Sequence, residues 1–364
     1  MHRHTLLLSL SAALLSLAAC TDRQTPVDPG VRRDVVAAPA ADFDLLLPGV
    51  PLRPGVAVDL HARVFVDESR PPSSCGPNQT ALAVHGFAHT AATWEGFAQA
   101  LFDSPPRTLC RLIALDLPGH GGSGLPTGGF PFSFLTLDDY ASAVLGALGA
   151  LPAQGLEART VIAHSQGGMV VQVAQHRLVS QGSSLRQAHD VREVVLLSPT
   201  MPDGLPWAFA ENGTAGLLLS NFLVPADPAL GTHFAIPDAL LSVVFFRNLS
   251  GELASGAPDG AEVAARGYNG PEPLLSALQL VGAAPFGQRS AIDAGIFSGG
   301  NGSQLTVVAF EQDQVIRPAE AAALFAHLAR HASNGNGFVT VSGSDAVHSM
   351  YVSDPAAVAG AMEP

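Results

Sequence analysis

Lysine is absent from this sequence. Its 18 basic residues are all arginine, and 31 acidic residues oppose them, so the formal net charge is −13 at pH 7. A surface of that sign repels phosphate backbones, which excludes nucleic acid as an expected partner. The absence of lysine also excludes every mechanism that needs a catalytic ammonium group or a lysine Schiff base.

Charged residues of both signs are scarce. They make up 13% of the 364 residues, whereas hydrophobic residues make up 47%. This balance is typical of a compact globular chain and excludes a mainly disordered one. The length is sufficient for one large α/β core.

Long hydrophobic runs are missing except near the start. There, an apolar run over residues 6–19 follows the short basic segment 1–4 and ends at Cys20. The run is too short to span a bilayer comfortably, and small residues precede Cys20, so we predict a secretory signal peptide over residues 1–19. Residues 20–41 are rich in Pro, Asp, Arg and Ala without periodicity, which is typical of a linker.

The end of this predicted signal peptide is more specific. Leu17–Cys20 (LAAC) resembles a bacterial lipobox, and the resemblance implies that Cys20 carries a lipid. We therefore expect an exported protein, anchored through Cys20 to a membrane of the cell envelope on its periplasmic or cell-surface side. An ordinary signal peptide that contains a cysteine is the alternative.

Cysteine is rare, with three residues in the whole chain. If Cys20 carries a lipid, Cys75 and Cys110 remain, and each lies shortly before an apolar, strand-like run at 81–84 and 112–115. If those strands are parallel neighbours, both cysteines lie at the same edge of a sheet. Because disulfides persist in exported proteins, we predict a Cys75–Cys110 disulfide, with two free thiols as the alternative.

Short β-rich runs alternate with longer helical ones along most of the chain. This alternation predicts an α/β fold over residues 42–364, with a mostly parallel central sheet and helices on both faces. Strands are expected at 56–66, 80–85, 110–116, 159–163, 192–198, 304–310 and 337–342, and helices at about 92–103, 136–150, 166–180 and 318–331.

The alternation breaks between about residues 199 and 302. A structureless loop of that length is improbable inside a compact domain, so we predict a small helical subdomain, a cap, inserted after one strand. Its aromatic residues indicate an apolar group near the site, or else they form the core of the cap itself. They are Trp207, Phe209, Phe222, Phe234, Phe245 and Phe246.

Ser165 lies where an expected strand runs into an expected helix, in Ala163–Gly168 (AHSQGG). Such a strand-to-helix turn exposes a serine hydroxyl, and the backbone N–H of Gln166 at the helix start faces developing negative charge. Ala163 stands where the pattern GxSxG has its first glycine. A serine in an ordinary turn is the alternative to a nucleophile.

A second backbone donor is expected from Val84–Phe87 (VHGF), which closes an earlier strand. The N–H of Phe87 and that of Gln166 would together stabilise an oxyanion, each contributing roughly 3 kcal/mol. His85 in this segment is interpreted as structural.

Together these segments, from about Thr80 to Pro355, resemble the α/β-hydrolase family. Asp116–Ser123 (DLPGHGGS) looks like that family's DxPGxGxS turn, which is architectural, so Asp116 and His120 are not catalytic candidates. The resemblance implies a catalytic acid after a late strand and a histidine near the C-terminus. Asp313 and His348 match those places.

The chain order Ser165, Asp313, His348 is the order of this family. A serine needs a base at neutral pH, and the base needs a partner that sets its tautomer. Glu311 and Asp203 are the alternatives for the acid. Although the chain has 13 histidines, it contains no HExxH or paired Cys/His spacing, so we expect neither a metal site nor a cofactor.

The predicted function is that of a serine hydrolase that cleaves small or medium apolar carboxylic esters through an acyl-enzyme. Segments 195–202 and 348–351 are similar to those of methylesterases and hydroxynitrile lyases, and the absence of lysine favours hydrolysis over lyase chemistry. A thioesterase, lactonase or cofactor-free perhydrolase would use the same triad. A non-catalytic, lipid-anchored binding protein is a further alternative.

Overall fold

The computed structural model describes residues 42–104, 109–204, 222–255, 257–280, 292–298, 302–329 and 335–362. By its contacts the chain divides into two units, Met1–Val36 and Ala37–Pro364, and all described residues belong to the second. The predicted signal peptide, the lipid site at Cys20 and the linker lie outside the described residues. So do Trp207 and Phe209 of the expected cap.

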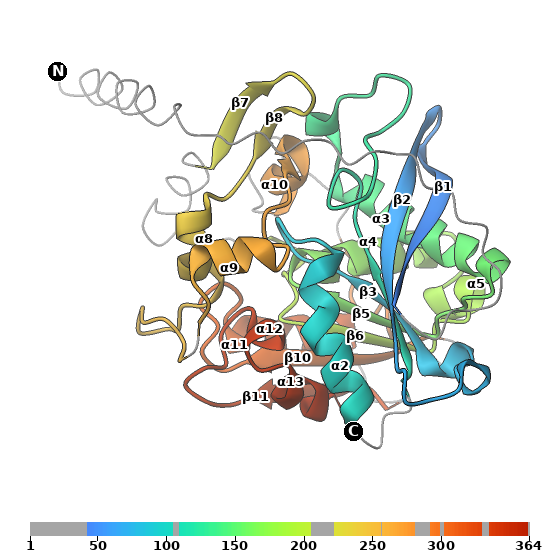
Figure 1. Ribbon diagram of the computed structural model, residues 1–364. Helices are drawn as coiled ribbons and strands as arrows, with labels where there is room; N and C mark the ends of the chain where they lie inside the picture. Colours follow the sequence, from blue (N-terminus) through green and yellow to red (C-terminus); the bar gives the residue numbers. More distant parts are fainter. Residues whose placement is uncertain are drawn as a thin grey trace. The chain divides into compact units, whose positions relative to one another are not determined.

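An eight-stranded sheet forms the centre of the described chain, in the order β1-β2-β4-β3-β5-β6-β10-β11 (Figure 1). The pairings of β2 with β1 and with β4 are antiparallel, and the other five pairings are parallel. This confirms the predicted mostly parallel sheet. The strands are β1 Phe43–Arg53, β2 Val56–Val66, β3 Thr80–Val84, β4 Arg111–Leu115, β5 Thr160–His164, β6 Glu193–Leu197, β10 Gln304–Phe310 and β11 Gly337–Val341.

Strand β1 was not predicted, although the seven other strands fall within a residue or two of their expected ranges. Pro48, Gly49 and Pro51 interrupt its alternation, and Gly49 has a positive φ. Such residues are tolerated because β1 is an edge strand, paired with β2 alone and with irregular register. Its pattern is therefore weaker than that of a central strand.

Helices cover both faces of the sheet, as predicted. Side chains alternate along β3, so Leu82 and Val84 pack in one core with α3, α4 and α11. Ala81 and Ala83 pack in a second core with α2, α12 and α13 on the other face. The helices are α2 Glu95–Asp103, α3 Leu137–Ala150, α4 Gln166–Ser180, α5 Leu185–His189, α11 Pro318–Leu328, α12 Met350–Ser353 and α13 Pro355–Ala361.

The interval between β6 and β10 is not purely helical. Among its described residues lie three short helices, but also a three-stranded antiparallel sheet, which the prediction of a helical cap did not include. The Asp227 carboxylate accepts from the N–H groups of Ala229 and Leu230, and this turn joins two of the strands. The elements are β7 Leu223–Asp227, β8 Gly231–Phe234, α8 Asp238–Phe245, α9 Gly260–Ala265, β9 Glu272–Pro273 and α10 Leu274–Leu280.

We use the name cap for the described residues between 222 and 280. Four of its predicted aromatic residues, Phe222, Phe234, Phe245 and Phe246, are buried in a core of its own. Ala88 and Val347, which flank the site described below, belong to the same cluster. The cap aromatics therefore form mainly the core of the cap. That core packs against Ala88 and Val347, which lie in two loops that follow strands of the main sheet.

Strands β3 and β4 are parallel neighbours, and the structure joins Cys75 and Cys110 in a disulfide just before them. The two Cα atoms lie 5.8 Å apart, and the Cys110 N–H donates to Gln79 O over 2.9 Å. Within the described ranges, no helix has both the length and the apolar character that crossing a bilayer requires.

Candidate active site

Ser165 occupies a sharp turn between β5 and α4. Its backbone has φ +50° and ψ −117°, a conformation that residues with a side chain rarely adopt. Its N–H donates to Leu197 O over 3.0 Å, which ties the turn to the neighbouring strand β6. Gln166, the next residue, begins helix α4.

Three glycines, Gly86, Gly167 and Gly168, pack closely around this turn. A Cβ on Gly167 would lie 2.5 Å from the carbonyl oxygens of Val84 and His85, and one on Gly168 would lie 2.7 Å from Pro199 Cβ. A Cβ on Gly86 would lie 3.2 Å from Ser165 Cβ. The loop after β3 thus lies directly against the serine.

Ala163, which replaces a glycine of the GxSxG pattern, is fully buried in β5. It pairs with Val84 of β3 and with Leu196 of β6. The sheet therefore accommodates its methyl group.

Ser165, His348 and Asp313 form one chain of hydrogen bonds. His348 Nε2 lies 3.0 Å from Ser165 Oγ, and His348 Nδ1 lies 2.8 Å from Asp313 Oδ2. A carboxylate only accepts, so Nδ1 carries the hydrogen and Nε2 is free to accept from the serine hydroxyl. All three side chains are buried.

The Asp313 carboxylate is also held by the backbone. Its Oδ1 accepts from the N–H groups of Val315 and Ile316, at 2.7 and 2.9 Å. Neither alternative acid contacts His348: Glu311 is exposed and accepts from the N–H of Gly343 at 3.0 Å, and Asp203 is exposed. The structure thus brings Asp313, rather than either alternative, to the histidine.

Ser198 is a further member that sequence reasoning missed. Its Oγ donates a hydrogen bond to Asp313 Oδ2, the same oxygen that His348 contacts. Ser198 directly follows β6, the strand that pairs with β10. Its place at the carboxyl end of β6 brings it beside the end of β10 only because those two strands pair, which the sequence does not reveal.

His164 supports the loop that carries His348. Its Nε2–H donates to the backbone carbonyl of His348 over 2.9 Å. Burial, and next the charge of nearby His348, hold the pKa of His164 well below its ordinary value. A neutral imidazole with its hydrogen on Nε2 is the form that makes this contact.

The two expected oxyanion donors lie on either side of Ser165. Phe87 follows Gly86, which packs against the serine, and Gln166 follows the serine in the chain. Within the described part of the chain, neither backbone N–H has a hydrogen-bond acceptor. Both therefore remain available to an oxygen bound beside Ser165.

His85 and Asp116 have structural contacts. His85 Nδ1–H donates to Gly86 O at 2.9 Å, and its Nε2 accepts from Leu117 N at 3.0 Å. Burial, and next the charge of His120, lower the pKa of His85 to about 3. The Asp116 carboxylate accepts from Ala91 N at 2.6 Å, and it also binds the N–H of Gly122 and the His61 ring.

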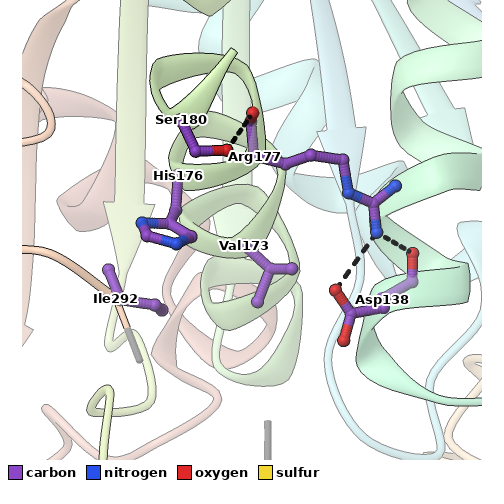
Figure 2. A pocket seen from close by; sticks show the side chains of 6 residues that line it. All are labelled: Asp138, Val173, His176, Arg177, Ser180 and Ile292. Carbon is purple, nitrogen blue, oxygen red and sulfur yellow. Dashed lines mark hydrogen bonds and ion pairs between the residues drawn. The ribbon is translucent and has the colours of Figure 1, made fainter. Parts of the chain in front are cut away.

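Other potential sites in the described residues are weak. No group of three or more His, Cys, Asp or Glu side chains there is arranged to hold a metal ion. A pocket of about 100 Å³ is lined by residues of the second half of α4, Val173 to Ser180, and by Asp138 and Ile292 (Figure 2). Arg177 in that pocket is already bound to Asp138, at 3.1 Å, so the pocket offers no free charge.

Comparison with known proteins places this geometry among hydrolases. A sequence model described as the alpha/beta hydrolase family matches residues 81–361. Protein phosphatase methylesterase 1 of Mus musculus is 28% identical over 142 residues, which are 39% of this chain and 33% of that protein. The chain spans about a third of the length of the curated relatives it matches.

Two solved structures share the fold. A thioesterase domain from the curacin biosynthetic pathway is 18% identical, with a TM-score of 0.52 over 88% of this chain and 98% of that one. A hypothetical protein from Pseudomonas aeruginosa PAO1 is 20% identical, with a TM-score of 0.50 over 88% of this chain and 96% of that one. At such identities the likeness concerns the fold alone.

Proposed function

The chain belongs to the alpha/beta hydrolase family, and from this premise we propose that it is a serine hydrolase of carboxylic esters with Ser165 as the nucleophile. One observation carries the proposal: Ser165, His348 and Asp313 form a buried, continuous chain of hydrogen bonds. A binding protein would have no need of this arrangement at a strained turn.

In the first half of the proposed reaction, His348 Nε2 takes the proton of the Ser165 hydroxyl as Oγ attacks the ester carbonyl. The tetrahedral oxyanion accepts hydrogen bonds from the N–H groups of Phe87 and Gln166. As the C–O bond to the alcohol breaks, His348 gives its proton to the leaving oxygen. The acyl group is now bound to Ser165 Oγ.

In the second half, His348 takes a proton from water, and the hydroxide attacks the acyl carbonyl. Collapse of this intermediate breaks the bond to Oγ, and His348 returns its proton to the serine. Asp313 stays ionised, holds the imidazole in the required tautomer, and stabilises its transient positive charge. The products are one alcohol and one carboxylic acid, and no cofactor is needed.

We propose small or medium apolar acyl groups as the substrates, and the apolar side chains beside the site support the apolar part of this proposal. The Phe245 ring of the cap stacks near His348, with ring centroids 6.3 Å apart. Ala88 and Val347 lie in the same apolar cluster as Phe245. An apolar group bound beside these side chains would lose water contact and gain packing.

Labelling of Ser165 tests the proposal directly. A serine-directed phosphonate should add one adduct to folded wild-type protein and none to Ser165→Ala. No adduct in folded wild-type protein would refute the nucleophile and favour a binding protein instead.

Substrate class is tested with p-nitrophenyl esters of increasing acyl length, run beside a thioester, a lactone and a peroxide-dependent assay. We expect the short and medium esters to give the highest kcat/KM. A thioester or lactone preferred by more than about tenfold, equivalent to about 1.4 kcal/mol, would reassign the substrate class.

We also propose that the protein is exported and attached through a lipid on Cys20 to a membrane of the bacterial cell envelope. The lipobox-like Leu17–Cys20 segment supports this location, and so does the disulfide, because such bonds persist in oxidising compartments. In cell fractionation, Cys20→Ala should leave the membrane fraction. Continued membrane association of that variant would contradict the anchor.

A further inference from the structure

Glu272 is a fully buried carboxylate in the cap, and the proposed reaction does not use it. It lies in β9, the last strand of the cap sheet, where it pairs with Phe234. Burying a carboxylate without partners is costly, so its contacts indicate what holds it there.

One oxygen of Glu272 binds the residue that follows the nucleophile. Glu272 Oε1 accepts from the Gln166 side-chain Nε2 at 2.7 Å and from Ser276 Oγ at 2.7 Å. Gln166 Nε2 also donates to Ser276 Oγ at 3.0 Å. These bonds join α10 of the cap to the first residue of α4, two helices labelled in Figure 1.

The carboxylate also sets the orientation of the Gln166 amide. Because Oε1 of Glu272 can only accept, the NH₂ end of Gln166 must face it. Gln166 Oε1 is buried without a partner among the described residues. The amide is therefore held from one end, by the cap alone.

The other oxygen of Glu272 faces His120 in the turn after β4. Glu272 Oε2 lies 3.4 Å from His120 Nε2, and neither side chain is exposed to solvent. His120 Nδ1 lies 3.2 Å from the carbonyl oxygen of Pro118, which can only accept, so Nδ1 carries a hydrogen. Neither Glu272 Oε2 nor His120 Nε2 has a hydrogen-bond partner among the described residues, so Gln166 and Ser276 make the hydrogen bonds that hold the carboxylate.

Aromatic rings surround this pair: the His85 ring lies 4.9 Å from that of His120, and the Tyr140 ring lies 5.9 Å away. Tyr140 has a high pKa because of burial, and next because of the Glu272 charge, so its phenol stays neutral.

We propose that Glu272 is a positioning residue, which clamps the cap to the nucleophile turn by holding the Gln166 side chain together with Ser276. The inference rests on the proposed function, in which the Gln166 N–H stabilises the oxyanion. A second cap contact lies nearby, where Gly270 N donates to Ala88 O at 2.9 Å, next to Phe87. The cap thus reaches both sides of the oxyanion site, and Glu272 makes the buried polar contact on the Gln166 side.

The two variants Glu272→Leu and Glu272→Gln test the clamp. Leucine removes every hydrogen bond, whereas glutamine can still accept from Gln166 and Ser276 through Oε1. We expect Glu272→Leu to lower kcat about tenfold with KM within about twofold, because the loss of a whole oxyanion donor lowers kcat by about 10² to 10³. Glu272→Gln should restore kcat to within about threefold of wild type.

Glu262→Gln is the matched control. It is a cap carboxylate in α9 that pairs with Arg266 at the surface and contacts no site residue, so its kinetics should be those of wild type. If Glu272→Leu fails to fold, Glu272→Gln and Ser276→Ala still decide, since Ser276→Ala removes one bond to Glu272 and one to Gln166. Its kcat should fall about threefold, as expected for the loss of a modest hydrogen bond.

Folded Glu272→Leu with wild-type kcat would overturn the proposal, and so would a change in KM alone. Amide hydrogen exchange separates its failure from that of the proposed function. If wild-type protein neither labels nor hydrolyses esters, the proposed function fails. Amide hydrogen exchange then tests the clamp independently of activity. Faster exchange at residues 166–169 in Glu272→Leu that returns to the wild-type rate in Glu272→Gln supports the clamp. Unchanged exchange overturns it.

Discussion

The Asp313 carboxylate is held by the backbone and in turn orients the His348 ring. Its two carboxylate oxygens receive four hydrogen bonds, from two backbone N–H groups, the His348 ring and the Ser198 hydroxyl. The bonds from the two backbone N–H groups hold the carboxylate in place. The bonds to the His348 ring and the Ser198 hydroxyl hold those two groups against it. Orientation of His348 therefore depends on a carboxylate that cannot rotate.

Asp313→Asn should lower kcat by about 10³ to 10⁴, because an amide neither stabilises the imidazolium nor selects the tautomer with hydrogen on Nδ1. Steady-state kinetics with a p-nitrophenyl ester measure this. The control is Glu311→Gln, an exposed acid on the same loop, which should stay within about twofold of wild type. Comparable losses in both variants would contradict the assignment of Asp313.

Ser198→Ala should lower kcat about fivefold. The variant removes one donor from the carboxylate that holds His348, a contribution of about 1 kcal/mol. Ser344→Ala, at an exposed position in the loop before His348, serves as its control. Unchanged kcat in Ser198→Ala would mean that the backbone bonds alone are enough to hold Asp313.

Some residues of the site could be predicted from the sequence, and others could not. Ser165 was selected from its local strand-to-helix pattern, whereas Asp313 and His348 were selected because they match the places that the family resemblance implies. Ser198 and Glu272 act through contacts with residues more than 100 positions away in the chain. No local pattern carries that information, and only the folded sheet and cap bring those partners together.

At the scale of elements, α4 and β3 approach so closely that Gly167 cannot carry a side chain. A Cβ there would lie 2.5 Å from two carbonyl oxygens of the β3 end, and backbone cannot yield as a flexible side chain does. This contact fixes the distance between the serine turn and the loop that carries Phe87. Activity and packing thus depend on the same glycine.

Gly167→Ala should lower the free energy of unfolding by more than about 2 kcal/mol, because overpacking forces α4 away from β3. Gly96→Ala in α2 is the matched control, since its Cβ would meet nothing within 4 Å. Alanine there should stabilise the helix by about 0.4 to 1 kcal/mol. Urea unfolding measures both, and equal effects of the two substitutions would contradict the close contact.

Elements buried on both faces were the easiest to predict. β5 and β6 have continuous apolar runs, and the helix over 166–180 has the bounds that its pattern predicted. β1 and the hairpin β7–β8 escaped prediction because edge and surface strands contain Pro, Gly and polar residues. Their pairing partners, rather than their own pattern, make them strands.

At the scale of the whole molecule, sheet order brings the site together. Ser165 follows β5, Ser198 follows β6 and Asp313 follows β10, and these three strands are adjacent and parallel. Their carboxyl ends therefore meet at one edge of the sheet. The sequence predicted the strands, but it contained no signal that β6 and β10 would pair across the long interval that holds the cap.

Acid should destabilise the whole molecule from about pH 6.5 downward. Burial, and next the charges of neighbouring histidines, lower the pKa of His85 to about 3 and hold those of His89 and His164 well below the ordinary value of 6.5. Below pH 6.5 the unfolded chain binds protons that the folded chain does not. Each of the three groups then contributes a slope of about 1.4 kcal/mol per pH unit.

Urea unfolding at pH 8, 7, 6 and 5 measures this dependence. His61 does not offset it: burial lowers its pKa, but the contacts with Asp116 more than compensate and raise it. Its stabilising effect is complete below pH 6.5 and is lost as the pH rises through its folded pKa. Equal stability at pH 7 and pH 5 would contradict neutral, buried forms of the three histidines.

The backbone conformation at Ser165 costs stability at the position where the proposed reaction needs a serine. At φ +50° and ψ −117° only glycine is free of strain, and a residue with a side chain costs about 1 to 3 kcal/mol there. Ser165→Gly should therefore be inactive yet more stable than Ser165→Ala, which keeps the strain, and urea unfolding of the two compares them. Selection for a stable fold alone would favour glycine at this position, so under the proposed function the serine is kept here for its hydroxyl at a cost in stability.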